Sequence, residues 1–112
     1  MKTIERTDLQ ALLAAGQPVR VLEALPPKYF NEGHLPGAKQ LDFANAVGHA
    51  TLLKLNTGDR IVVYCASDTC KNSHEAAAAL SAAGYTDVAV YVGGKKDWTE
   101  AGLALEGARV AA

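Results

Sequence analysis

A short run of apolar, mostly β-branched residues limits most strongly how this chain can fold. Residues 61–64 read Ile-Val-Val-Tyr without any polar alternation. Such a run is typical of a strand buried on both faces, as in a parallel sheet covered by helices. Residues 88–92 repeat the pattern as Val-Ala-Val-Tyr-Val, and residues 19–22 predict a further strand.

Helical segments are predicted between these strands. Thr7 and Gln10 have capping-box spacing before a leucine-containing face, and Gly16 is a natural stop. The Pro26-Pro27 pair can open a short helix, and the segment 42–55 is predicted to be partly helical.

The clearest predicted helix runs from Asn72 to Ala83. Asn72 and Glu75 again have capping-box spacing, and Gly84 follows an alanine-rich body. A last short helix is predicted to start at Asp97. The alternation predicts an α/β fold, a parallel sheet flanked by helices on both faces, in a single domain spanning residues 1–112.

Composition narrows the class of function. The 112 residues are 49% hydrophobic and 21% charged with net charge −1, so no basic surface for nucleic acid is expected. No segment approaches the roughly 20 apolar residues of a membrane span, and no signal peptide is recognisable, so we expect a cytoplasmic protein without a membrane association. Its two cysteines lack zinc-site spacing, and nothing calls for a metal or cofactor.

Cys65 is the candidate nucleophile because it directly follows the buried strand 61–64. Sites in parallel α/β sheets form beyond the carboxyl ends of the strands. The N–H groups of the loop and of the next helix would favour a thiolate there. Position alone is equally compatible with an inert cysteine that ends a core strand.

The loop after Cys65 is the expected anion cradle. It consists of Ala66, Ser67, Asp68, Thr69, Cys70, Lys71, Asn72 and Ser73. Cys70 is either a resolving thiol for Cys65 or an incidental, partly exposed thiol.

Four motifs, in order, resemble the single-domain rhodanese-like family over nearly the whole chain. They are Val21-Leu22-Glu23, Glu32-Gly33-His34-Leu35-Pro36-Gly37-Ala38, Val62-Val63-Tyr64-Cys65, and Val92-Gly93-Gly94 followed by Trp98 and Ala101-Gly102-Leu103. The resemblance implies a rhodanese-like sulfurtransferase. Cys65 would take sulfur from a small anionic donor such as thiosulfate or a mercapto acid, and would pass it to a thiol or cyanide.

The resemblance also suggests roles for other residues. Glu23 stands where the family usually has Asp, and His34 lies in the signature segment; both are interpreted as structural residues near the site. Leu25 replaces the usual Arg, and the loop looks about two residues longer than the common one, which puts thiosulfate preference in doubt. Independently of the resemblance, the Lys95-Lys96 pair is interpreted as a solvated helix entrance.

Three other functions stay open. A persulfide carrier would exchange sulfur with a protein donor or acceptor, and a non-catalytic interaction module would keep only the scaffold. A cysteine-based phosphatase or arsenate reductase needs an arginine on the loop to grip oxyanions. This loop has only Lys71.

Overall fold

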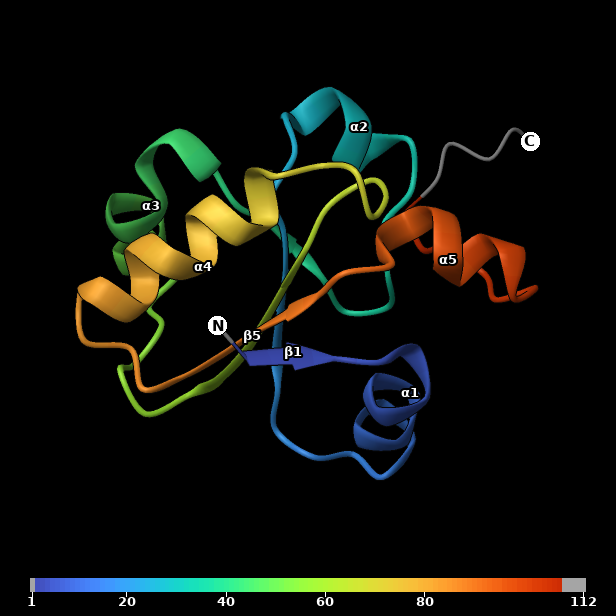
Figure 1. Ribbon diagram of the computed structural model, residues 1–112, viewed down its shortest axis with the longest axis horizontal. Coiled ribbons are helices and arrows are strands. Elements are labelled where there is room, and N and C mark those ends of the chain that lie inside the picture. Colours follow the sequence, from blue (N-terminus) through green and yellow to red (C-terminus); the bar gives the residue numbers. More distant parts are fainter. Residues whose placement is uncertain (1, 108–112) are drawn as a thin grey trace.

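The computed structural model describes residues 2–107 as a twisted sheet between helices (Figure 1). The five strands are all parallel and lie in the order β1-β5-β4-β2-β3. Their bounds are β1 (Lys2–Ile4), β2 (Arg20–Glu23), β3 (Lys39–Gln40), β4 (Arg60–Tyr64) and β5 (Asp87–Tyr91). The helices are α1 (Arg6–Ala14), α2 (Pro27–Asn31), α3 (Ala46–Leu52), α4 (Asn72–Ala82) and α5 (Gly94–Glu100), with a 3-10 turn, η1, at Phe43–Asn45.

The central strand β4 contributes to the cores on both faces of the sheet. Ile61 and Val63 pack into the cluster that includes α3 and α4. Val62 and Tyr64 pack into the cluster that includes Leu9 of α1 and Trp98 of α5. Figure 1 shows α3 and α4 on one side of the sheet and α1 and α5 on the other. The apolar run therefore has no polar alternation because both of its faces are buried, as predicted.

Most long elements confirm the expectations, and the remaining differences have local causes. The helix α1 begins at Arg6 after Glu5, so Thr7 lies inside it and the expected capping box is absent. Pairing of β1 with β5 ends at Ile4, which leaves the chain free to turn into a helix directly. The expected box at Asn72 is also absent, because Lys71 is the N-cap and no side chain caps α4.

Two strands were not predicted, and a second helix starts earlier than expected. The strands β1 and β3 have three and two residues and lie at the edges of the sheet. The helix α5 begins at Gly94, three residues before the expected start, because N–H groups of its first turn bond to the loop after β4.

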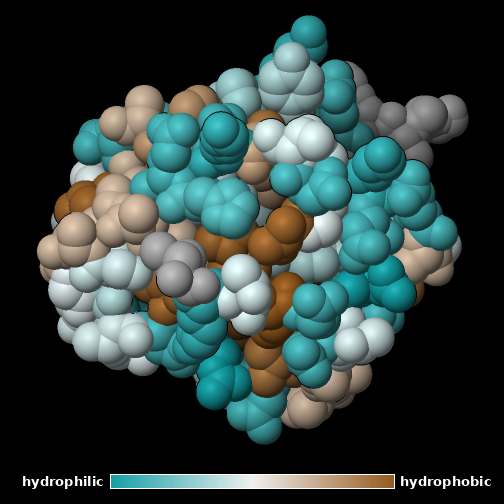
Figure 2. Space-filling view, in the orientation of Figure 1, coloured by the Kyte–Doolittle hydropathy of each residue, from teal (hydrophilic) through white to brown (hydrophobic). Residues whose placement is uncertain are grey.

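The surface is mostly hydrophilic in the view of Figure 2, with an apolar strip near the middle of this face, over the region of β1 and β5. Within residues 2–107, no helix is long and apolar enough to cross a membrane.

Candidate active site

Cys65 is the first residue after the middle strand of the sheet. Its neighbours are the carboxyl ends of β2 and β5, to which β4 pairs on either side. The residue is only 1% exposed, and its Sγ lies 3.9 Å from the carbonyl oxygen of Ala24. The structure thus places Cys65 where ligands bind in parallel α/β sheets.

The loop brings Cys70 back onto Cys65. The two Sγ atoms are joined as a disulfide, and their Cα atoms are 6.1 Å apart. The N–H of Cys70 donates to the carbonyl of Ser67 at 3.2 Å, and the hydroxyls of Ser67 and Thr69 are 3.0 Å apart. The loop from Cys65 to Cys70 therefore forms a tight turn that brings the two sulfur atoms together.

The remaining loop residues differ in exposure. Ala66, Asp68, Thr69 and Lys71 are exposed, Ser67, Cys70 and Asn72 are half-buried, and Ser73 is buried. Cys70 lies in a surface groove whose other lining residues are Asp68, Thr69, Lys71, His74, Glu75 and Ala78. The two sulfurs thus face different surroundings, one in the core and one at a groove.

The first turn of α5 forms hydrogen bonds with the beginning of the loop that follows β4. The N–H groups of Lys95 and Lys96 donate to the carbonyls of Cys65 and Ala66 at 3.0 and 2.9 Å. Gly94 has φ +65°, and a Cβ there would lie 2.4 Å from the Cys65 carbonyl oxygen. Only glycine permits this close approach together with this backbone conformation.

A buried charge pair lies beside this anchor. Glu23 is 0% exposed, and its Oε2 is 3.0 Å from Nζ of Lys95, which is 16% exposed. The ammonium donates a hydrogen bond to the Tyr29 carbonyl at 2.7 Å, while its contact with Oε2 is an ion pair without hydrogen-bond alignment. The interpretation of Lys95 as a solvated residue was therefore wrong, because its partner lies far away along the chain.

Tyr64 links that pair to the signature segment. Its hydroxyl donates to Oε1 of Glu23 at 2.7 Å and accepts from the N–H of Leu35 at 3.0 Å. Burial, and then the neighbouring Glu23 carboxylate, raises the pKa of Tyr64 well above its usual range. The hydroxyl therefore stays protonated and can bridge the two segments.

Within the described residues, His34 makes backbone hydrogen bonds and a stacking contact. Its own backbone pairs with that of Glu106 through two hydrogen bonds of 3.0 and 2.7 Å. Its Nδ1 lies 3.2 Å from the Phe30 carbonyl, and its ring stacks on that of Phe30. The His34 ring thus contacts Phe30, and within residues 2–107 no hydrogen bond joins an imidazole nitrogen to the loop of residues 66–73.

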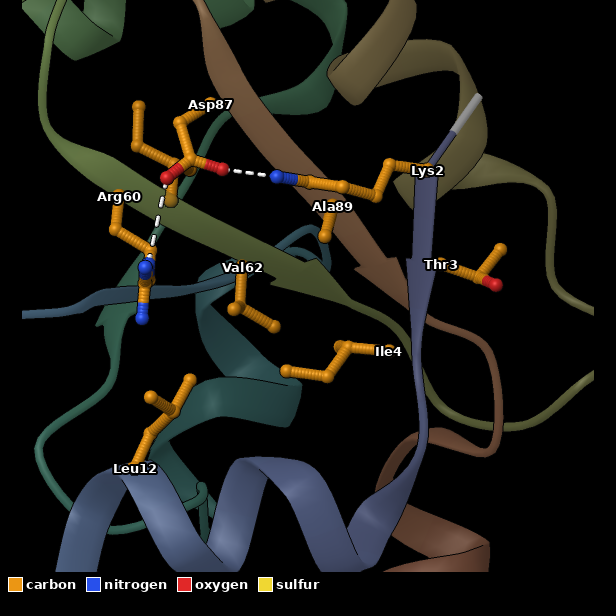
Figure 3. Close-up of a pocket in the computed structure, with 9 residues that line it drawn as sticks. Lys2, Thr3, Ile4, Leu12, Arg60, Val62, Asp87 and Ala89 are labelled. Carbon is orange, nitrogen blue, oxygen red and sulfur yellow. Dashed lines mark hydrogen bonds and ion pairs between the residues drawn. The ribbon is translucent and has the colours of Figure 1, made fainter. Parts of the chain in front are cut away.

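The pocket of Figure 3 lies at the other end of the sheet. Its lining includes Lys2, Arg60 and Asp87, the first residues of β1, β4 and β5. Its other lining residues are Thr3, Ile4, Leu12, Ile61, Val62 and Ala89, so it contains none of the predicted site residues. Among the described residues, no cluster of three or more His, Cys, Asp or Glu is arranged to hold a metal ion.

Comparison with known proteins agrees with this fold. Residues 5–101 match the model of the rhodanese-like domain, so the chain belongs to the rhodanese-like domain family. No curated protein matches the chain in a sequence comparison.

Solved structures of the same fold are similar over almost the whole chain. The rhodanese-like domain of an Anabaena protein has a TM-score of 0.86 at 25% identity, covering 100% of this chain and 84% of that one. A thiosulfate sulfurtransferase from Pseudomonas aeruginosa has a TM-score of 0.83 at 26% identity, covering 96% of this chain and 20% of that one. The human single-domain sulfurtransferase TSTD1 has a TM-score of 0.75 at 21% identity, covering 89% of this chain and 96% of that one, which shows the shared fold.

Proposed function

We propose that the protein is a sulfurtransferase in which Cys65 carries a sulfane sulfur as a persulfide. The observation that carries the proposal is the place of Cys65, at the carboxyl end of the central strand and at the start of a tight loop that leads into α4. Family membership supports the same chemistry.

The reaction has two steps. The Cys65 thiolate attacks the outer sulfur of the donor, forms a sulfur–sulfur bond and releases the rest of the donor as an anion, which is sulfite when the donor is thiosulfate. A thiol or cyanide then takes the outer sulfur and restores the thiolate. Such covalent catalysis predicts ping-pong kinetics.

The surroundings of the loop suit an anionic intermediate. The first turn of α4 has no side-chain cap, so its N–H groups remain free to favour negative charge in front of it. Lys71 is exposed on the same loop and adds a positive charge. Glu23 and His34 act at a distance, by fixing the backbone segments that border the site.

Small anionic sulfane donors are the proposed substrate class. A thiosulfate sulfurtransferase is among the structural relatives, although this chain spans only 20% of its length. A mercapto acid or a protein persulfide would react at the same sulfur. A protein partner would reach the loop through the groove beside Cys70.

Intact mass spectrometry tests the proposal. The protein is reduced, freed of reductant, and incubated with thiosulfate or with mercaptopyruvate, alongside Cys65→Ser and Cys70→Ser. We expect Cys70→Ser to gain the mass of one sulfur atom and Cys65→Ser to gain none. Equal labelling of both variants, or of neither, would contradict the proposal.

A phosphatase or arsenate reductase is less well supported. No arginine occurs between Arg60 and Arg109, and lysine does not reproduce the planar two-point grip on an oxyanion. Cys65-dependent hydrolysis of an aryl phosphate would favour this alternative over sulfur transfer.

A further inference from the structure

The two cysteines are arranged so that Cys70 reaches the sulfur atom of Cys65 itself. Their Cα separation of 6.1 Å lies within the usual range for a disulfide, and the sulfurs are bonded. The backbone of Cys65 is held by β4 on one side and by the Lys95 N–H on the other. A persulfide formed on Cys65 would therefore have the Cys70 sulfur within reach of its inner sulfur.

We propose that Cys70 is an internal acceptor that converts the bound sulfane sulfur into hydrosulfide. This inference rests on the proposed persulfide of Cys65. The Cys70 thiolate attacks Sγ of the protonated persulfide, and a bond forms between the two cysteine sulfurs. The bond from Cys65 Sγ to the outer sulfur breaks, and the outer sulfur leaves as HS⁻ with the bonding electron pair. The sulfane sulfur is thereby reduced by two electrons, and the two cysteines are oxidised to the disulfide.

The step gives the protein an activity beyond transfer to an external acceptor. One turnover yields one hydrosulfide and one oxidised chain, so a second turnover requires a reductant. A dithiol, either small or borne by a protein, supplies the two electrons and leaves as its own disulfide. The overall reaction converts a sulfane donor and a dithiol into the desulfurised donor, hydrosulfide and a disulfide.

Cys65 and Cys70 differ in exposure, and this difference determines which of the two sulfurs the reductant attacks. Cys65 is 1% exposed, whereas Cys70 is half-buried and lies in the groove with Thr69, Lys71 and His74. An incoming thiolate therefore attacks Sγ of Cys70. The Cys65 thiolate is the leaving group. The uncapped start of α4, which begins two residues after Cys70, favours negative charge in front of it, and a stabilised thiolate leaves faster. The reductant's second thiol then releases Cys70.

A single-turnover experiment tests the internal step. Reduced wild type, Cys70→Ser and Cys70→Ala are mixed with thiosulfate, or with mercaptopyruvate, in the absence of any added thiol. Sulfite or pyruvate measures loading of Cys65, and hydrosulfide measures the second step. We expect all three proteins to load, but only the wild type to release about one hydrosulfide per chain and to end with a mass two hydrogens below the reduced form. Ser81→Ala, an exposed change on α4, is the matched control and should behave as wild type.

The outcomes separate this inference from the proposed function. Loading of the wild type with a stable persulfide and no hydrosulfide would overturn the internal step and leave the sulfurtransferase intact. Absence of both sulfite and pyruvate would overturn the proposed function and this inference with it.

Trapping the reductant as a mixed disulfide tests which cysteine it attacks. The disulfide form is treated with a thioredoxin-type dithiol protein whose second cysteine is replaced by serine, and the adduct is located by peptide mapping. We expect the mixed disulfide on Cys70, and an adduct mainly on Cys65 would overturn the assigned direction.

Discussion

The two ends of the sheet both carry ion pairs, but they place them in opposite environments. At the carboxyl end, Glu23 is fully buried and Lys95 is 16% exposed. At the amino end, Asp87 pairs with Lys2 and Arg60, whose side chains are 57% and 47% exposed (Figure 3). The buried pair is connected to the backbone around Cys65, whereas the exposed pairs join the first residues of neighbouring strands.

The comparison of the two ends shows which ion pairs the stability of the fold depends on. A buried carboxylate without a partner is strongly unfavourable, so Glu23 depends on Lys95 and Tyr64. Exposed pairs are screened by water and contribute little. We therefore expect changes near Cys65 to lower stability far more than similar changes at the amino end.

Two glycines provide the largest expected contrast. Gly94 and Gly16 both have positive φ, but only at Gly94 would a Cβ meet other atoms, beginning with the Cys65 carbonyl. We expect Gly94→Ala to lower the free energy of unfolding by about 4 kcal/mol, from backbone strain and overpacking. Gly16→Ala should lower it by about 1 kcal/mol, from strain alone. Urea unfolding of both variants measures the difference, and equal losses would show that the close approach at Gly94 is unimportant.

Removing the buried ammonium is the next largest expected effect. Lys95→Met leaves the Glu23 carboxylate unpaired and should lower the free energy of unfolding by about 3 kcal/mol. The neighbouring Lys96 is exposed, so Lys96→Met should change it by less than about 0.5 kcal/mol. Adding Glu23→Gln to Lys95→Met should restore most of the loss, because no buried charge remains. A double variant as unstable as Lys95→Met would argue against the ion pair.

The Tyr64 hydroxyl should matter somewhat less. Tyr64→Phe leaves Oε1 of Glu23 and the N–H of Leu35 without their partner, which should cost about 2 kcal/mol in urea unfolding. Tyr85→Phe is the matched control, since the hydroxyl of Tyr85 makes no hydrogen bond with the residues described here. A similar loss in both variants would assign the effect to packing.

The same hydroxyl predicts a pH dependence. The pKa of Tyr64 is raised in the fold, so above pH of about 10 the unfolded chain loses this proton while the folded chain keeps it. Unfolding is then favoured, and stability falls as pH rises. Burial and Asp97 raise the pKa of Tyr91 in the same direction. Unfolding free energies from about pH 8 to pH 11 should decline less steeply in Tyr64→Phe than in the wild type.

The smallest expected effect is at the exposed end. Asp87→Asn removes the charge that pairs with Lys2 and Arg60, and should lower the free energy of unfolding by less than about 1 kcal/mol. Lys2, ahead of Arg60, lowers the pKa of Asp87. The small contribution of the Asp87 charge to stability is therefore present near neutral pH and is lost as pH falls below about 4. A loss as large as that of Lys95→Met would contradict the contrast between the two ends.

Much of the fold and the place of Cys65 could be predicted from the sequence. The apolar run before Cys65 indicates a doubly buried strand by composition alone, and Cys65 follows it in the chain, so its place at the carboxyl end needs no further information. The alanine-rich segment likewise indicates α4. These features are local, because burial on both faces and helix propensity are both expressed in neighbouring residues.

Only the tertiary structure decided what surrounds that cysteine. The edge strands β1 and β3 are too short for a periodic pattern and form by pairing with β5 and β2. Lys95 resembles a surface residue until Glu23 is brought to it, and the early start of α5 depends on the carbonyls of Cys65 and Ala66. The sequence alone determined which residue follows the doubly buried strand. Contacts between distant segments determined how Cys65 is held, because burial and pairing across the chain depend on the folded backbone, and the conformation of the loop determined that its sulfur meets that of Cys70.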